Sequence, residues 1–84
     1  MTYSVLILRR AQKELEDLPR ESYERVCQAI LDLAPDPRAS GCRKLTGRDG
    51  WRIRVGAYRV VYEIDEDAGT ITILHVGHRR DVYR

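Results

Sequence analysis

The sequence predicts an α+β fold, in which a helical hairpin packs on one face of an antiparallel sheet of three to four strands. Three features predict it: a short apolar run at the start, two amphipathic helical patterns separated by a proline, and segments of period-two alternation in the second half. With 84 residues, 43% apolar and 33% charged, the chain is expected to form a single domain over residues 1–84.

The first half predicts one strand and two helices. Residues 3–8 are rich in strand-forming side chains and should form the first strand. In the first helix the apolar stripe is Ala11, Leu15 and Leu18, and the residues expected to face water are Lys13, Glu14, Glu16 and Asp17. Pro19 should end this helix, because proline lacks the backbone N–H that the preceding turn needs.

A second helix is expected from about Arg20 to Ala34, antiparallel to the first. Its apolar stripe is Tyr23, Val26, Ile30 and Leu33. The prolines at 35 and 37 end it, and residues 36–50 read as a polar connection. This connection carries the basic residues Arg38, Arg43, Lys44 and Arg48.

The remaining chain predicts strands. WRIRV and YRVVYEI, residues 51–55 and 58–64, alternate with period two around Gly56 and Ala57, a pair that favours a type II′ hairpin turn. DEDAG, residues 65–69, turns the chain into a further strand over residues 70–76. The tail GHRRDVYR either leaves the sheet or adds a last short strand.

The register of this hairpin gathers arginines on one face. A two-residue turn places Arg54 opposite Arg59 and Arg52 opposite Val61, while the apolar residues fall on the other face, towards the helices. Like charges directly opposite each other are destabilising, so an anion is expected between them. A phosphodiester fits, because guanidinium groups bind phosphate oxygens in a bidentate manner.

The charge distribution and the tail support an anionic ligand. Residues 42–84 hold nine Lys and Arg against six Asp and Glu, although the whole chain has a formal net charge of only +2. The tail adds His78, Arg79, Arg80 and Tyr83, which offer positive charge, a titratable ring and a phenol. We expect Arg43, Lys44, Arg48 and Arg80 to contact the phosphodiester backbone of such a ligand.

The other histidine and the remaining tyrosines are interpreted as structural residues. His75 falls on the arginine side or in the core, depending on the length of the turn at residues 65–69, and we interpret it as structural. The spacing of Tyr3, Tyr23, Tyr58 and Tyr62 places them in the core.

Several classes of protein are not supported. Cys27 and Cys42 form no metal-binding or redox motif, so we expect reduced thiols, no metal and no cofactor. The apolar run at the start is too short to span a membrane and does not resemble a signal peptide. We therefore expect a cytoplasmic protein with no membrane partner.

The segments KLTG, WRIRVGAYRVVYEID and ITILHVGHRRDVYR, in this order and spacing, resemble the RelE branch of the RelE/ParE superfamily of bacterial toxins. The resemblance extends over nearly the whole chain. It implies a toxin of a type II toxin–antitoxin system: a ribosome-dependent endoribonuclease that cuts mRNA in the A site. It also implies a cognate antitoxin as partner, with operator DNA contacted only through the toxin–antitoxin complex.

The resemblance also implies roles for individual residues. Arg59 and Arg79 match arginines that contact the scissile phosphate, and Tyr83 matches a tyrosine that stacks on or helps activate the substrate. Arg52 and Arg54 occupy positions that are lysines in the best-studied type. Arginine keeps its proton at any accessible pH, so the proton acceptor is sought among His78, Tyr83 and Glu63. The alternative is an enzyme without such an acceptor, which relies mainly on electrostatics and on the ribosome to align the RNA.

Two alternatives share this fold. A ParE-like toxin would inhibit DNA gyrase, and a binding module without toxicity would only partner an antitoxin. The clustered arginines with a titratable histidine and tyrosine favour the nuclease, because a gyrase inhibitor does not need a cationic pocket of phosphate size.

Overall fold

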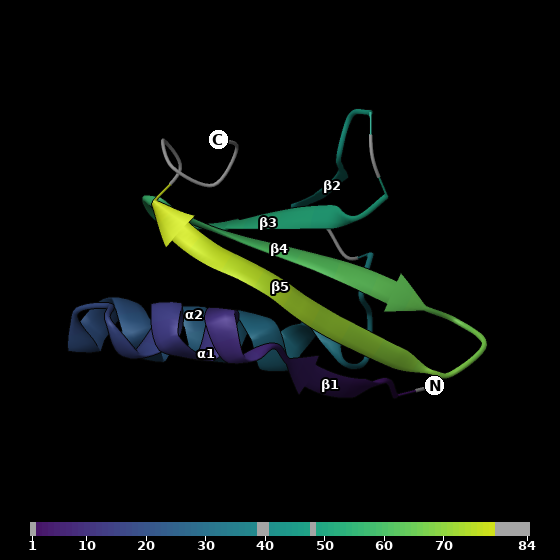
Figure 1. The fold of residues 1–84 in the computed structure, drawn as a ribbon, viewed down its shortest axis with the longest axis horizontal. Coiled ribbons are helices and arrows are strands. Elements are labelled where there is room, and N and C mark those ends of the chain that lie inside the picture. Colours follow the sequence, from purple (N-terminus) through teal and green to yellow (C-terminus); the bar gives the residue numbers. More distant parts are fainter. Residues whose placement is uncertain (1, 39–40, 48, 79–84) are drawn as a thin grey trace.

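The computed structural model describes residues 2–38, 41–47 and 49–78. Two helices lie beneath one face of a five-stranded sheet, as Figure 1 shows, so the predicted α+β fold is confirmed. The elements in chain order are β1 (Ser4–Ile7), α1 (Arg9–Glu16), α2 (Arg20–Leu33), β2 (Cys42–Lys44), β3 (Trp51–Val55), β4 (Tyr58–Asp65) and β5 (Thr70–His78). Across the sheet, the strand order is β1-β5-β4-β3-β2.

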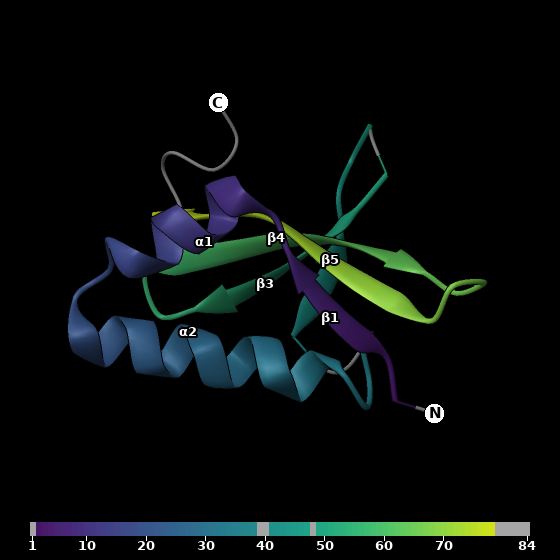
Figure 2. The same ribbon diagram turned by 60° about the horizontal axis from the view of Figure 1, so that its bottom comes forward.

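The helical hairpin forms where the sequence predicts it. The chain reverses between α1 and α2, as Figure 2 shows. Pro19 occupies the N-cap position of α2. Proline suits this position because its fixed φ is compatible with a helix start and a free N–H is not needed there. Within the described residues, no helix is long and apolar enough to cross a membrane.

The hairpin of β3 and β4 has the predicted register. Trp51 pairs with Tyr62, and Val55 pairs with Tyr58 at the turn. Gly56 has φ +61° whereas Ala57 does not have a positive φ, which is the pattern of a type II′ turn. The two faces of the hairpin therefore separate as expected.

The sheet has more strands than the three to four expected. The additional strand is β2, which lies within the segment interpreted as a polar connection and pairs antiparallel with β3. Three residues with mixed polarity carry too little period-two signal to be recognised as a strand. β1 pairs parallel with β5, from Ser4 opposite Thr70 to Ile7 opposite Ile73, so the sheet is not purely antiparallel.

The pairing of β4 with β5 contains an irregularity that changes which face His75 occupies. Asp65 pairs with Thr70, and this register continues to Tyr62 opposite Ile73. A β-bulge then shifts the register, so that Val61 pairs with His75. Without the bulge, His75 would have faced the helices; with it, His75 shares the face of Val61 and Arg52.

The core lies between the helices and the sheet. Its buried residues come from both helices and from β4 and β5: Ala11, Leu15, Val26, Ile30, Leu33, Val60, Tyr62, Ile71, Ile73 and Val76. The predicted stripes are buried at Ala11 and Leu15 of α1 and at Val26, Ile30 and Leu33 of α2. Leu18 lies beyond the end of α1 and is only partly buried, and the expectation that Tyr23 lies in the core is wrong, because Tyr23 is 37% exposed. The expectation that Glu14 faces water is wrong, because its carboxylate contacts β5.

Tyr62 anchors the loop after α2 to the centre of the sheet. Its hydroxyl donates a hydrogen bond of 2.7 Å to the carbonyl oxygen of Pro37, and both residues are buried. Burial raises the pKa of the Tyr62 phenol, so the hydroxyl keeps its proton and remains a donor.

The substitution Tyr62→Phe should lower the free energy of unfolding by about 1–3 kcal/mol, because it leaves the buried carbonyl of Pro37 without this donor. Urea unfolding followed by circular dichroism measures the change. Tyr3→Phe is the matched control, since Tyr3 is only partly buried. An equal loss in both variants would mean that the Tyr62 hydrogen bond contributes nothing specific.

Candidate functional site

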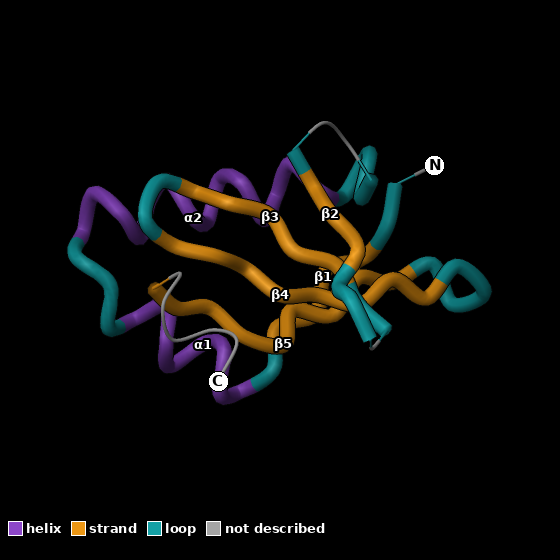
Figure 3. The backbone as a smooth tube through the Cα atoms, turned by 90° about the horizontal axis from the view of Figure 1, so that it is seen from above, coloured by secondary structure: helices purple, strands orange, loops and turns teal. Residues whose placement is uncertain are grey.

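The arginines that the hairpin register predicts on one face do lie on the face opposite the helices. Arg54 pairs with Arg59, Arg52 pairs with Val61, and Arg43 of β2 pairs with Arg52. We call Arg43, Arg52, Arg54 and Arg59 the arginine face. Figure 3 looks onto this side of the sheet, where β2, β3 and β4 lie side by side.

A groove of about 680 Å³ runs along β2 and β3, and three residues of the arginine face line it: Arg43, Arg52 and Arg59. Its lining residues are Cys42, Arg43, Lys44, Leu45, Thr46, Trp51, Arg52 and Arg59. Four of these are cations and none of the described lining residues is acidic. We call it the basic groove. A water-filled hollow with several cations and no carboxylate concentrates positive potential, so it attracts anions.

The cations of the basic groove differ in exposure. Arg43 and Lys44 are exposed at the outer strand, whereas Arg52 and Arg59 are half-buried and the Nε atom of Arg59 is buried. A partly buried guanidinium is held in position by its surroundings and interacts more strongly with an anion than one in free solvent. Arg54 belongs to the same face but is exposed and does not line the groove.

The structure separates His78 from the arginines. His78 pairs with Tyr58 at the end of β5, and the two rings make an edge contact with centroids 6.1 Å apart. Tyr58 belongs to the face that packs towards the helices, so the register places the His78 ring on that face as well. Four further predicted site residues lie outside the described residues: Arg48, Arg79, Arg80 and Tyr83.

Carboxylates gather at the C-terminal end of β4, near Asp65. A second groove of about 560 Å³ lies there. Its lining includes Lys44 and the acidic residues Asp49, Glu63, Asp65, Glu66 and Asp67. Within the described ranges Glu63 makes no ion pair, although it lies on the same strand as Arg59. Near this groove Arg38 forms an ion pair with Glu66, and its guanidinium lies over the Trp51 ring, 5.4 Å from the ring centroid.

Metal binding is not supported by the described part of the chain, where no three His, Cys, Asp or Glu side chains gather as a metal site needs. Cys27 and Cys42 are both free thiols.

The family model described as the ParE toxin of the type II toxin–antitoxin system parDE matches residues 5–83. The chain belongs to the RelE/ParE superfamily of toxins. Toxin RelG of Mycobacterium tuberculosis is 36% identical to it over 88 residues, which cover 100% of this chain and 99% of RelG. These relationships identify a type II toxin.

Solved structures place this RelE/ParE toxin in the RelE branch. The toxin–antitoxin complex RelBE2 of M. tuberculosis superposes with a TM-score of 0.83 at 30% identity, covering 94% of this chain and 100% of that chain. The archaeal RelE–RelB complex of Pyrococcus horikoshii OT3 gives a TM-score of 0.76 at 35% identity, with coverage of 98% and 100%. The resemblance to RelE in the sequence is thereby confirmed.

Sequence reasoning missed two features of the site in this RelE-type toxin. It did not find β2, the strand that brings Arg43 opposite Arg52 and closes the basic groove on one side. It also did not find the contact between Glu14 and His75, which lie 61 positions apart. The only sequence signal for Glu14 was its position on the flank of the apolar stripe of α1, beside Leu15.

Proposed function

We propose that the protein is a ribosome-dependent endoribonuclease that cleaves mRNA in the ribosomal A site. The observation that carries the proposal is the basic groove, which presents four cations and no described acid beside an exposed sheet face. A phosphodiester matches this charge and the bidentate geometry of arginine. The membership of the RelE branch supports the same function.

The reaction would be attack of a ribose 2′-hydroxyl on the adjacent phosphate. In its transition state, negative charge increases on the phosphate oxygens, and preorganised cations stabilise that charge. Arg52 and Arg59 are proposed to do so, and Arg54 and Arg79 are proposed to assist; the half-buried positions of Arg52 and Arg59 in the basic groove support their part in this. Tyr83 is proposed to stack on the substrate, and Arg43, Lys44, Arg48 and Arg80 to hold the flanking RNA.

Proton transfer needs a group other than the arginines. The sequence suggested His78 or Tyr83, but the ring of His78 packs against Tyr58 on the helix side of the sheet. This position does not favour His78 as the residue that deprotonates a nucleophile bound in the basic groove. No cofactor is required for the reaction that we propose.

We further propose that a cognate antitoxin binds the toxin and covers the arginine face or displaces the tail, and that the pair contacts operator DNA together. RelE-type relatives have been solved as complexes with RelB antitoxins, which supports an antitoxin of that kind. Expression of the toxin and its action on ribosomes would take place in the cytoplasm.

One experiment tests the nuclease proposal directly. Purified toxin is added to ribosomes carrying a defined mRNA, and the same mRNA is treated without ribosomes. We expect cleavage only on the ribosome, leaving a 2′,3′-cyclic phosphate and a 5′-hydroxyl, because ribosomal alignment supplies the orientation that the open groove cannot. Absence of cleavage under both conditions would contradict the proposal.

The match to the ParE family model favours gyrase inhibition as the second candidate. A supercoiling assay with purified gyrase, run on the same preparation, separates the two functions. Inhibition of supercoiling together with intact mRNA would assign the protein to the ParE type of toxin.

A further inference from the structure

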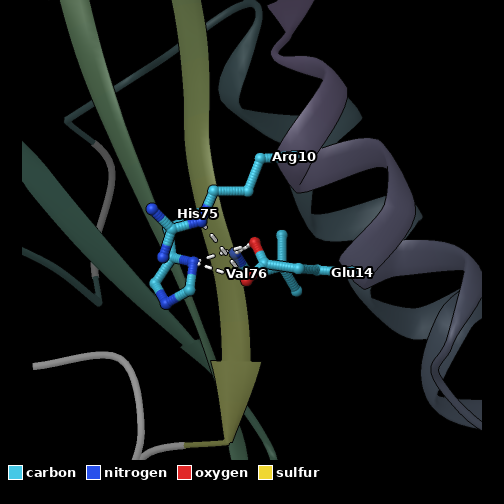
Figure 4. A network of polar contacts seen from close by, with 4 residues as sticks. All are labelled: Arg10, Glu14, His75 and Val76. Carbon is cyan, nitrogen blue, oxygen red and sulfur yellow. Dashed lines mark hydrogen bonds and ion pairs between the residues drawn. The ribbon is translucent and has the colours of Figure 1, made fainter. Parts of the chain in front are cut away.

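A polar cluster joins α1 to the edge of β5, and Figure 4 shows its members. β1 accompanies β5 only as far as Ile73, whose carbonyl accepts a hydrogen bond from the Leu8 N–H at 3.1 Å. Beyond this point the Glu14 carboxylate takes the place of a neighbouring strand. Its Oε1 accepts a hydrogen bond of 3.0 Å from the backbone N–H of Val76.

The same carboxylate holds the ring of His75. The Nδ1 atom of His75 lies 2.8 Å from Oε1 and 2.7 Å from Oε2 of Glu14. Because an ionised carboxylate only accepts hydrogen bonds, Nδ1 must carry the proton, and in the neutral ring Nε2 is then the acceptor. A carboxylate that orients an imidazole in this way also stabilises the imidazolium formed when Nε2 takes up a proton.

The bulge in β5 places this histidine on the arginine face. His75 pairs with Val61, which on its other side pairs with Arg52. Arg59 pairs with Gly77, two residues further along β5, so His75 and Arg59 are diagonal neighbours. Such neighbours lie roughly 7–8 Å apart, within reach of a long arginine side chain.

Glu14 and His75 are both partly buried, which leaves them accessible for proton transfer. The His75 side chain is 17% exposed and that of Glu14 is 26% exposed, so the pair is shielded but not closed to solvent. Arg10 approaches Glu14 at 3.7 Å, but its side chain is 70% exposed and therefore contributes little. The described lining of the basic groove contains neither an imidazole nor a carboxylate.

We propose that His75, oriented by Glu14, is the general base of the reaction on the arginine face. The proposal rests on the nuclease function proposed above. In the step, the O–H bond of the ribose 2′-hydroxyl breaks, its proton passes to Nε2 of His75, and the oxygen forms a bond to phosphorus. The bond from phosphorus to the 5′-oxygen breaks with its electron pair, and that oxygen takes a proton from solvent. The products are a 2′,3′-cyclic phosphate and a 5′-hydroxyl.

Glu14→Gln distinguishes proton transfer from a structural role. The amide oxygen of glutamine can still accept the hydrogen bond from Val76, so the strand edge remains satisfied. The amide nitrogen, however, is a donor, and its pairing with Nδ1 would leave the proton on Nε2 and remove the base. Single-turnover cleavage on the ribosome should therefore slow by about 10- to 10⁴-fold with little change in the apparent KM for ribosomes.

The matched control is Glu24→Gln, which neutralises an exposed carboxylate on α2. Its cleavage rate should equal that of the wild type. If Glu14→Gln also cleaves at the wild-type rate while remaining folded, Glu14 only supports the strand and the proposal is wrong.

His75→Ala tests the base itself. The rate should fall about 10²- to 10⁴-fold, and added imidazole should restore part of it in proportion to its concentration, because free imidazole can occupy the vacated space and accept the proton. Arg59→Ala removes a cation instead of a base, so imidazole should not restore its activity. An His75→Ala variant that retains wild-type activity, or that is folded and not rescued, would overturn the assignment.

The pH dependence provides an independent readout. A base acts only when neutral, so the wild-type rate should fall as pH decreases, and His75→Ala should lose this dependence. Among the described residues, the charged groups near His75 are Glu14 and Arg10 from α1, Arg59 from β4 and, beyond β4, Arg52 from β3. Arginine side chains keep their charge at any accessible pH, so a pH dependence that changes only in the His75 and Glu14 variants is due to these two residues.

Failure of the wild type to cleave would refute the nuclease function itself, whereas unchanged pH dependence in an active His75→Ala would refute only the role of His75.

Discussion

Replacing Arg59 with alanine should reduce ribosome-dependent cleavage by about 10²- to 10³-fold, the usual effect of removing one preorganised group that stabilises a developing negative charge. Arg59 lines the basic groove, pairs with Arg54 across the hairpin and is half-buried. Its guanidinium is therefore oriented before substrate arrives. Single-turnover cleavage of a defined mRNA on purified ribosomes measures the loss.

Two further variants make this prediction specific. Arg20→Ala removes an arginine of α2 whose side chain is 92% exposed, and it should cleave at the wild-type rate. Arg59→Lys keeps the positive charge but lacks the planar fork, so its activity should lie between those of the wild type and Arg59→Ala. Circular dichroism should show that all three variants are folded. Equal activity of Arg59→Ala and Arg20→Ala would remove Arg59 from the site.

Replacing Leu15 with alanine should lower the free energy of unfolding by about 2–5 kcal/mol, a large part of the roughly 5–15 kcal/mol available to a domain of this size. Leu15 is 1% exposed and contributes to the core that joins α1 to β5. Its truncation leaves a cavity that the surrounding side chains only partly fill. Urea unfolding at equilibrium measures the loss.

Leu31→Ala is the matched control, because Leu31 lies on α2 and is 61% exposed. The same chemical change there should lower the free energy of unfolding by less than about 0.5 kcal/mol.

Leu15 neighbours Glu14 in sequence, so loosening α1 should also weaken the contact of Glu14 with β5. Hydrogen exchange at the Val76 amide should accelerate in Leu15→Ala and not in Leu31→Ala; equal rates would mean that α1 is held by other contacts.

Local patterns in the sequence predict the main part of this fold and site. The alternation in residues 51–55 and 58–64 and the glycine at 56 together specify the hairpin register, because a two-residue turn leaves one pairing that buries a single apolar face. The pairing of Arg54 with Arg59 follows from that register without any knowledge of the rest of the chain. Both helices were likewise predictable from their apolar stripes.

Other features depend on residues that are distant in sequence. β2 exists because β3 offers an unpaired edge, and three residues of mixed polarity do not indicate it by themselves. The face of His75 depends on a bulge that no turn length specifies, since without the bulge the observed pairing of Asp65 with Thr70 would place His75 on the helix side. For the same reason His75, interpreted as structural, becomes the residue to which we assign the base.

By itself the sequence determined the fold class, the RelE resemblance, and the placement of Arg52, Arg54 and Arg59 on one face, because period-two alternation and turn chemistry act over a few residues. Only the tertiary structure decided that Arg43 closes the basic groove, that His78 lies against Tyr58, and that Glu14 reaches across 61 positions to His75. The contact of Glu14 with β5 forms where an open strand edge needs a hydrogen-bond partner. Which side chain supplies that partner depends on how α1 packs on the sheet, and no local pattern contains this information.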